Sequence, residues 1–215
     1  MIGSGFLVDL LQGGLVSLEI AVGAWIVASV LGLVLAVARD LGLIVLKIPI
    51  IGLSTTLRSL PQLVILYLFY FGVGQLGIEV NSLLAAILAL GVTDAAFVAE
   101  YYRAGFMTVS PSQRDAGRSI GLSELGVMRS VVIPQAVPYV VPPLLNAFVG
   151  LMKTATLASA VGTPEILYRA QSDISRTGQI VQTMAVLIIL YLLATMPLTR
   201  AVAVLERRAR SMAYA

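Results

Sequence analysis

The sequence contains no cysteine and no histidine. Disulfides, zinc or iron–sulfur sites built on those ligands, thiol nucleophiles and histidine bases are therefore excluded. Charge is also scarce, because charged residues make up 12% of the 215 residues, against ~25% in a typical soluble domain. A soluble protein of this size needs a polar surface that this chain cannot supply. The composition argues against a soluble enzyme, a nucleic-acid binder and a disordered regulator.

Apolar residues are abundant instead: they make up 59% of the chain, and the mean hydropathy is +0.96. A membrane-spanning helix needs about 20 mostly apolar residues. Five stretches of suitable length and character occur, at 20–38, 59–78, 82–99, 130–152 and 177–199. The sequence therefore predicts an all-α membrane protein with about five transmembrane helices in one domain, 1–215.

Two further apolar segments are too short or too mild to span a membrane. Segment 48–57 is predicted to be a short helix lying at a membrane face. Segment 154–164 consists of small and mildly polar residues, and we expect it to line protein rather than lipid, because irregular backbone at membrane depth must be shielded from lipid.

The few basic residues predict the orientation of the spans. If the N-terminus lies outside, the inner segments are 39–58, 103–129 and the tail from Arg200, and they hold eleven of the fourteen basic residues. Basic residues gather in cytoplasmic loops, which predicts an N-out, C-in topology. The same rule accounts for the net charge of +3 without an acidic partner, and anionic lipid headgroups suffice to explain the basic C-terminal cluster.

The loop between the third and fourth spans carries signals for a short helix. Ser110 is a good N-cap, Pro111 fits the first helical position, and Gln113 completes a Ser-x-x-Gln capping box. Gly121 suits the left-handed position that follows a helix. These signals predict a helix over 111–120, which either closes a surface loop or docks a soluble partner.

The stretch DAGRSIGLSELGVMRSVVIPQA, which begins at Asp115, resembles the EAA loop of permease subunits in ATP-binding-cassette (ABC) importers. Four further elements resemble the polar amino-acid permease branch of that family, in the same order. They are RSLPQ at 58–62, FVAEYYRAG at 97–105, PQA and PPLLN within 134–146, and MKTATL at 152–157. The resemblance covers roughly residues 15–210.

The chain departs from this pattern at three points. Asp115 replaces the glutamate of the EAA loop and Gly117 replaces its second alanine, so acidity and small size are preserved. In the third span the family often has Asn-Ser-Gly/Ala-Ala-Tyr, where this chain has TDAAF with Asp94. The last change bears on the substrate more than on the mechanism.

The resemblance implies a type I ABC importer (MetI-like) permease fold in the inner membrane of a prokaryote. It implies import of a polar amino acid or related solute, with a second permease copy or homologous chain, an ABC ATPase dimer, an extracytoplasmic solute-binding protein and membrane lipid as partners. The chain itself would hold no cofactor or metal and would catalyse nothing. ATP and Mg²⁺ would bind the ATPase, since no Gly-x-x-x-x-Gly-Lys-Ser/Thr run occurs here.

The resemblance assigns coupling to the ATPase to a helix at 110–122. The expected coupling residues are Asp115, Ala116, Gly117, Ser119, Gly121, Ile133 and Pro134. Among them, the small residues Ala116, Gly117 and Gly121 would allow another surface to approach closely.

Ionisable residues inside spans are rare and are by default functional candidates. Asp94 either contacts an amino group of the substrate, pairs internally with Arg58 or Lys153, or is a protonated acid at a subunit seam. Glu100 and Arg103 share a helix face, and their spacing favours an ion pair. The hypothetical substrate path comprises Arg58, Gln62, Thr93, Asp94, Glu100, Asn146, Lys153 and Thr154.

The outer segment 162–178 carries charges of alternating sign. Glu165, Arg169, Asp173 and Arg176 follow one another at helical spacing, which predicts a surface helix with ion pairs between successive turns. This helix would either meet the binding protein or present a solvated face.

Other functions stay open on the residues alone. The solute could be an amino-acid derivative such as ectoine or an opine. The chain could also be a stand-alone secondary transporter or channel, or a membrane assembly subunit; secondary transporters often show inverted repeats, and none is evident here. A co-purifying ATPase would discriminate among these classes.

Overall fold

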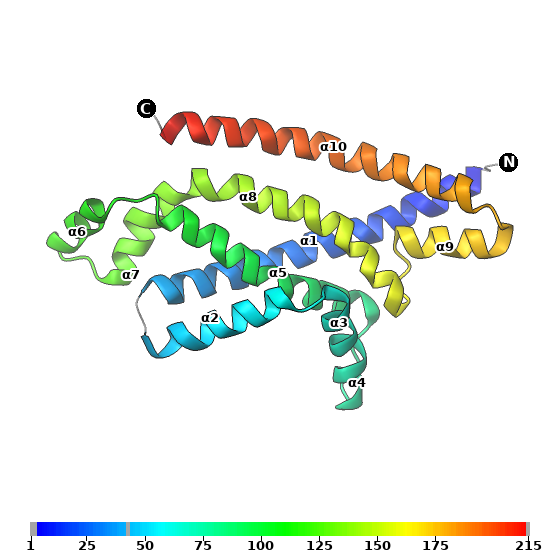
Figure 1. The fold of residues 1–215 in the computed structure, drawn as a ribbon, viewed down its shortest axis with the longest axis horizontal. Coiled ribbons are helices and arrows are strands. Elements are labelled where there is room, and N and C mark those ends of the chain that lie inside the picture. The colour runs from blue at the N-terminus through cyan, green and yellow to red at the C-terminus, as the bar shows by residue number, and fades with distance from the viewer. Residues whose placement is uncertain (1–3, 42–43, 214–215) are drawn as a thin grey trace.

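The computed structural model describes residues 4–41 and 44–213, and these residues are almost entirely helical. Long helices run side by side, and the N- and C-termini lie at opposite ends of the molecule (Figure 1). The helices are α1 (Ser4–Asp40), α2 (Ile44–Ser59), α3 (Gln62–Tyr67), α4 (Val73–Gln75), α5 (Ser82–Phe106), α6 (Pro111–Ser119), α7 (Glu124–Val127), α8 (Ile133–Thr154), α9 (Ile166–Thr177) and α10 (Ile180–Ala213).

The predicted number of spans agrees with the structure. Four helical stretches in the described residues are long and apolar enough to cross a membrane: Gly5–Asp40, Ser82–Phe106, Glu124–Val161 and Ile180–Arg207. A fifth span arises if the bent pair α2 and α3–α4 counts as one. The all-α fold with about five spans is therefore confirmed.

The second span, predicted at 59–78, is helical over 62–75, but a sharp bend separates this part from the helix before it. The chain bends by 104° between α2 and α3, at Leu60 and Pro61. Proline disfavours helical backbone in the residue before it, and Pro61 itself is extended, with ψ of 130°. The segment predicted as a separate short helix, 48–57, is part of α2. We call this bend between α2 and α3 the elbow.

The first span was predicted too short, at 20–38. Helix α1 starts at Ser4, and Glu19 lies exposed on its surface. A charged residue therefore ended the apolar window in the sequence without ending the helix. Prolines do not end the fourth span either: helix α8 continues through Pro138, Pro142 and Pro143.

Helices α1 and α5 form the centre of the bundle because glycines let them approach closely. A Cβ atom on Gly32 would lie 2.6 Å from Val98 Cγ1, and one on Gly91 would lie 2.7 Å from Val27 Cβ. Small residues at helix–helix contacts favour association in membranes through van der Waals packing. The two helices are thus packed as one unit.

Replacing Gly32 with alanine is expected to destabilise this unit by about 1–3 kcal/mol, because the added methyl group overpacks the contact with Val98. The matched control is Gly52→Ala in α2, where no heavy atom lies within 4 Å of the added Cβ. There the better helix propensity of alanine is expected to add about 0.5–1 kcal/mol. Thermal unfolding of the two variants in detergent measures the difference. Equal midpoints would show that close α1–α5 packing is not required.

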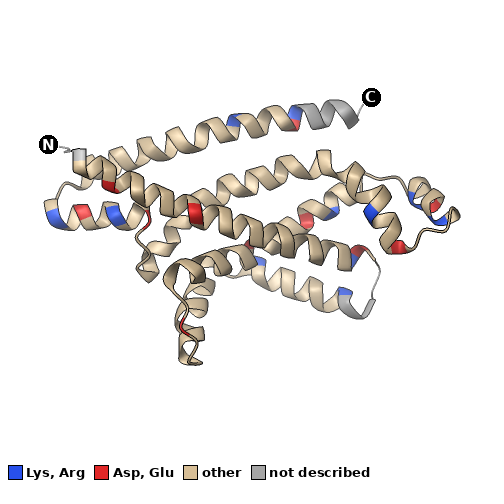
Figure 2. Ribbon diagram, turned by 180° about the vertical axis from the view of Figure 1, so that it is seen from behind, with Lys and Arg blue, Asp and Glu red and all other residues tan. Residues whose placement is uncertain are grey.

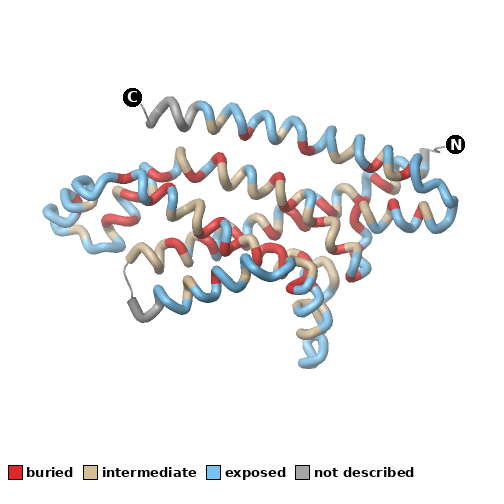
Figure 3. The backbone as a smooth tube through the Cα atoms, viewed as in Figure 1, coloured by how far each residue is buried: buried red, intermediate tan, exposed pale blue. Residues whose placement is uncertain are grey.

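Helix α10 lies along one side of the bundle and exposes most of its surface (Figure 3). Its buried positions, among them Thr183, Leu187 and Thr195, face α8 and α9. Between α8 and α9 the short 3₁₀ helix η3 (Ala155–Val161) buries Ala155 and Ala158 in the main core. Segment 154–164 therefore packs mainly against protein, as predicted.

Candidate functional site

The predicted helix at 111–120 is present as α6, at the end of the bundle opposite the N-terminus (Figure 1). Gly121 has a φ of +85°, so it takes the expected left-handed position. The capping box was wrong. The Ser110 hydroxyl makes no cap bond and lies 3.0 Å from the Ser112 hydroxyl. The Ser110 carbonyl instead accepts the Gln113 N–H.

Most of the expected coupling residues face solvent. The exposed ones are Asp115, Ala116, Ser119, Gly121 and Pro134. Ile133 is half-buried, whereas Gly117 is buried, and a Cβ on it would lie 3.2 Å from Val127 Cγ2. The small size of Gly117 therefore lets α6 pack on its own chain, and Ala116 is left as the small residue on the free face.

The surface around α6 combines apolar and charged groups. Met107, Ile120 and Leu125 are 61–78% exposed, an arrangement typical of a surface that another protein covers. Arg118 binds Glu124 at 2.7 Å and Asp115 at 2.6 Å, which ties α6 to α7. The hydrogen bond to Glu124, more than any other contact, raises the pKa of Arg118 above its usual value, so Arg118 stays charged.

Three arginines from three helices surround the carboxylate of Glu100. Its oxygens lie 2.5 Å from Arg103 Nη1 and 2.8 Å from Arg39 Nη1, and a longer contact of 3.9 Å joins it to Arg58 Nη2. The predicted Glu100–Arg103 pair is therefore confirmed within a larger cluster. We call Glu100, Arg39, Arg58 and Arg103 the arginine cluster. Sequence reasoning missed Arg39 because it lies 61 residues from Glu100.

The elbow is held against α5 on both sides of the bend. Before the bend, Arg58 contacts Glu100; after it, Gln62 Nε2 donates to Asp94 Oδ1 at 2.8 Å. Of the alternatives left open for Asp94, the pair with Arg58 or Lys153 is not formed: among the described residues, Arg58 contacts Glu100 and neither cation forms a salt bridge with Asp94. Asp94 lies farther from the C-terminal end of α5 than Glu100 does. Its polar partner is the neutral side-chain amide of Gln62.

The two threonines of the predicted substrate path direct their hydroxyl groups to backbone carbonyls of their own helices. Thr93 is buried and donates to the Ala89 carbonyl at 2.7 Å. Thr154 lies 3.4 Å from the carbonyl oxygens of Gly150 and Leu151. Neither hydroxyl is oriented toward a solute by these contacts.

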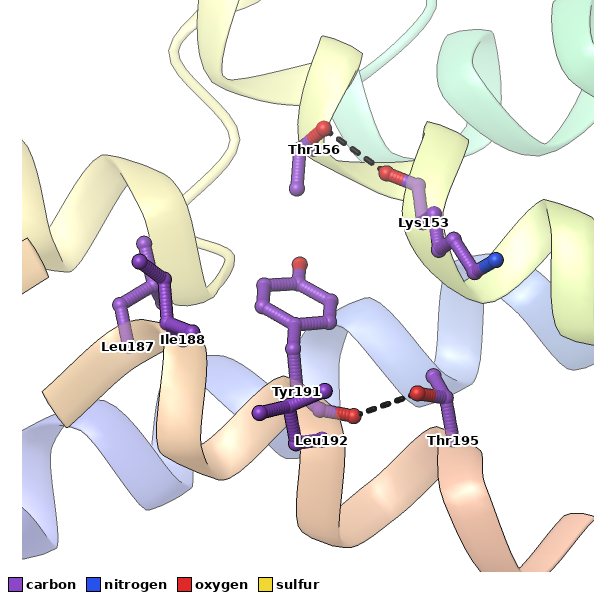
Figure 4. Close-up of a pocket in the computed structure, with 7 residues that line it drawn as sticks. All are labelled: Lys153, Thr156, Leu187, Ile188, Tyr191, Leu192 and Thr195. Atoms are coloured by element: carbon purple, nitrogen blue, oxygen red, sulfur yellow. Dashed lines mark hydrogen bonds between the residues drawn. The ribbon is translucent and has the colours of Figure 1, made fainter. Parts of the chain in front are cut away.

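Lys153 lines a cavity of about 380 Å³ between the end of α8 and α10 (Figure 4). Thr156, Tyr191 and Thr195 contribute polar atoms, but most of the α10 wall is aliphatic, formed by Leu187, Ile188 and Leu192. Such a wall suits an apolar chain better than a zwitterion. Asn146 is exposed elsewhere on α8, so the structure separates the predicted path residues into several places.

The outer helix α9 does not carry the predicted ladder of ion pairs. Glu165 is fully buried and caps α9, accepting from Tyr168 N at 2.7 Å and Leu167 N at 3.0 Å. Burial raises the pKa of Glu165 above its usual value, against the opposing effect of those hydrogen bonds. Arg169 pairs with Asp9 of α1.

Of the charges predicted along this outer helix, one pair is formed between helix neighbours: Asp173 and Arg176, at 3.0 Å. Figure 2 shows most lysines and arginines gathered toward the two ends of the bundle. Some of these basic residues join separate helices, as Arg39, Arg114 and Arg169 do.

Comparison with known proteins gives consistent matches. Residues 28–211 match the family described as binding-protein-dependent transport system inner membrane component. The probable glutamine ABC transporter permease protein GlnM of Bacillus subtilis is 34% identical over 183 residues, 83% of each chain. The probable amino-acid ABC transporter permease protein YckA of the same organism is 35% identical over 143 residues, covering 66% of this chain and 63% of that protein.

Two solved structures share the fold. A crystal structure of an amino acid ABC transporter with histidines has a TM-score of 0.85 and 27% identity, covering 95% of each chain. An inward facing conformation of the MetNI methionine ABC transporter has a TM-score of 0.75 and 21% identity, covering 94% of this chain and 99% of that one. The second likeness concerns the fold alone.

Proposed function

The chain belongs to the family of binding-protein-dependent transport system inner membrane components, and we propose that it is the membrane-spanning subunit of an ATP-driven importer for a polar amino acid. It is a multi-pass protein of the cytoplasmic membrane. The observation that carries the substrate class is the likeness to relatives named as amino-acid permeases over most of the chain. The likeness to a solved amino acid ABC transporter supports it.

The proposed assembly contains two permease chains, identical or homologous, and two ATPase subunits beneath them. Each ATPase would receive one α6 with the exposed Met107, Ile120 and Leu125 around it. ATP and Mg²⁺ would bind there, while this chain moves the solute. A solute-binding protein would deliver the solute at the outer face near α9, and lipid would cover much of α10. No nucleic acid takes part.

We place the amino group of the solute near Asp94. A carboxylate held by a neutral amide can accept an ammonium group in exchange for the Gln62 hydrogen bond, without first losing an ion pair. Asp94 also lies beside the elbow, where the broken backbone of α2 and α3 can line a cavity rather than lipid. These features support a contact with solute more than a structural ion pair.

Replacing Asp94 with asparagine is expected to raise the KM for uptake roughly 10- to 100-fold, because a hydrogen bond to a charged group contributes about 1.5–3 kcal/mol. The matched control is Thr93→Val, which removes a hydroxyl bonded within its own helix. Its KM is expected to stay close to the wild-type value. Initial uptake rates across solute concentrations measure both, and an unchanged KM for Asp94→Asn would remove Asp94 from the path.

Reconstitution tests the function itself. The permease, its ATPase and its binding protein are placed in proteoliposomes, and uptake of a panel of amino acids, ectoine and an opine is measured with and without internal ATP. ATP-dependent uptake of an amino acid supports the proposal. Uptake confined to ectoine or the opine, or uptake that needs no ATPase, contradicts it.

A further inference from the structure

Helix α1 reaches from the outer helix α9 to the region of the docking helix α6. Its 37 residues make a rod of about 55 Å at 1.5 Å per residue. That length exceeds the roughly 30 Å hydrocarbon core of a membrane. Figure 1 shows α1 running from beside α9 at its N-terminal end to the opposite end of the bundle.

At the inner end, one arginine joins α6 to two long helices. Arg114 Nη1 donates to Asp40 Oδ2, in the last residue of α1, at 2.7 Å. Arg114 Nη2 donates to the carbonyl of Phe106, the last residue of α5, also at 2.7 Å. The last carbonyls of a helix lack intrahelical donors and carry the negative end of its dipole. The planar fork of arginine suits both acceptors at once.

The other contacts of α6 are local by comparison. Arg118 binds Glu124 in α7, and Gly117 packs near Val127 of the same short helix. Within the described residues, Arg114 makes the side-chain hydrogen bonds that connect α6 directly to α1 and α5. The side chains of Arg114 and Asp40 are 20% and 21% exposed, so water screens their ion pair less than it would a surface pair.

At the outer end, α1 is joined to α9 by a second set of contacts. The Ser17 hydroxyl accepts from Ile166 N at 3.2 Å, and it lies 3.2 Å from two acceptors, Glu165 Oε2 and the Gly13 carbonyl of its own helix. Arg169 pairs with Asp9. Gly13 lets α9 approach so closely that a Cβ on it would lie 2.8 Å from Ile166 Cα. Both ends of α1 are thus fastened to helices outside the central bundle.

We propose that Arg114 is the positioning residue that holds the coupling helix on α1, and that α1 carries the movement of α6 to the outer helix α9. The inference rests on the proposed function in one respect, the docking of an ATPase on α6. It adds a route. A shift of α6 pulls on Asp40, the tightly packed α1–α5 pair moves as one body, and α9 follows through Ser17 and Asp9.

The test uses the full complex in proteoliposomes and compares Arg114→Gln with Arg129→Gln, an exposed arginine on the same inner side. For Arg114→Gln, the ATPase is expected to co-purify as in wild type. Solute imported per ATP hydrolysed is expected to fall about tenfold, within the range of allosteric coupling energies. Stimulation of ATP hydrolysis by the loaded binding protein is expected to fall with it. Arg129→Gln is expected to match wild type.

Charge exchange separates positioning from a loss of folding. Arg114→Asp and Asp40→Arg should each uncouple transport, and the double variant should recover part of the imported solute per ATP. Loss of ATPase co-purification in Arg114→Gln would make Arg114 a docking residue and overturn the proposal. An unchanged amount of solute imported per ATP hydrolysed would also overturn it. Failure of the proposed function appears differently, as absent amino-acid uptake by the wild-type complex; the ratio is then measured with whichever solute it imports.

Discussion

Uptake is expected to be abolished when Ala116 is replaced by arginine, although the protein should still insert and fold. Ala116 is the small exposed residue on the free face of α6. A long cation placed there would be buried without a partner when an ATPase closes on the helix. Such a charge costs about 2–5 kcal/mol at an interface, which weakens binding roughly 30-fold or more. Co-purification of the ATPase and ATP-dependent uptake in proteoliposomes measure the loss.

The matched control is Ala201→Arg, which adds the same side chain at an exposed position of α10, within the C-terminal segment that the topology places inside. This variant should retain the ATPase and most of its uptake, because an arginine near the membrane surface can reach the headgroups. Equal membrane abundance of the two variants shows that insertion is unaffected. Normal uptake by Ala116→Arg would remove α6 from the docking surface.

Replacing Glu100 with glutamine is expected to produce the second large effect, a loss of stability at the inner half of the bundle. The change leaves Arg39, Arg58 and Arg103 close together without their shared carboxylate. Breaking a fully buried ion pair costs about 3–5 kcal/mol. Because the side chains of the arginine cluster are 19–34% exposed, we expect a smaller cost of about 2–4 kcal/mol. Thermal inactivation in detergent and uptake measure it.

Two further variants define the cause of that loss. Glu19→Gln removes the same charge from an exposed position of α1 and should change stability by less than about 0.5 kcal/mol. Glu100→Asp keeps the charge on a shorter side chain and should fall between wild type and Glu100→Gln. If Glu100→Gln proves as stable as Glu19→Gln, the arginine cluster does not hold α1, α2 and α5 together.

Local signals in the sequence predicted local structure well. Pro111 and Gly121 bound α6 correctly, because each restricts the backbone at its own position. The capping box predicted at Ser110 is absent, because a hydroxyl can form hydrogen bonds with several nearby groups. Here the Ser110 hydroxyl lies against the Ser112 hydroxyl. The Glu100–Arg103 pair was predicted because its two members are neighbours on one helix.

Pairings between distant segments could not be predicted in this way. Arg169 had the right spacing for Glu165, yet it pairs with Asp9, and Glu165 caps its own helix instead. Arg114 and Asp40 lie 74 residues apart, and nothing in the intervening sequence indicates that they meet. Which of several possible partners a charged side chain pairs with depends on which helix packs next to it in the folded structure.

The sequence by itself determined the class of protein and the position of helix α6, and it predicts the N-out, C-in orientation. These follow from hydropathy, from the distribution of basic residues and from backbone restrictions at single positions, all of which act locally. Only the tertiary structure decided the arginine cluster around Glu100 and the fastening of α1 to α6 and α9. The physical reason is that a poorly solvated charge must find a partner, and packing selects that partner from whichever helix lies within reach.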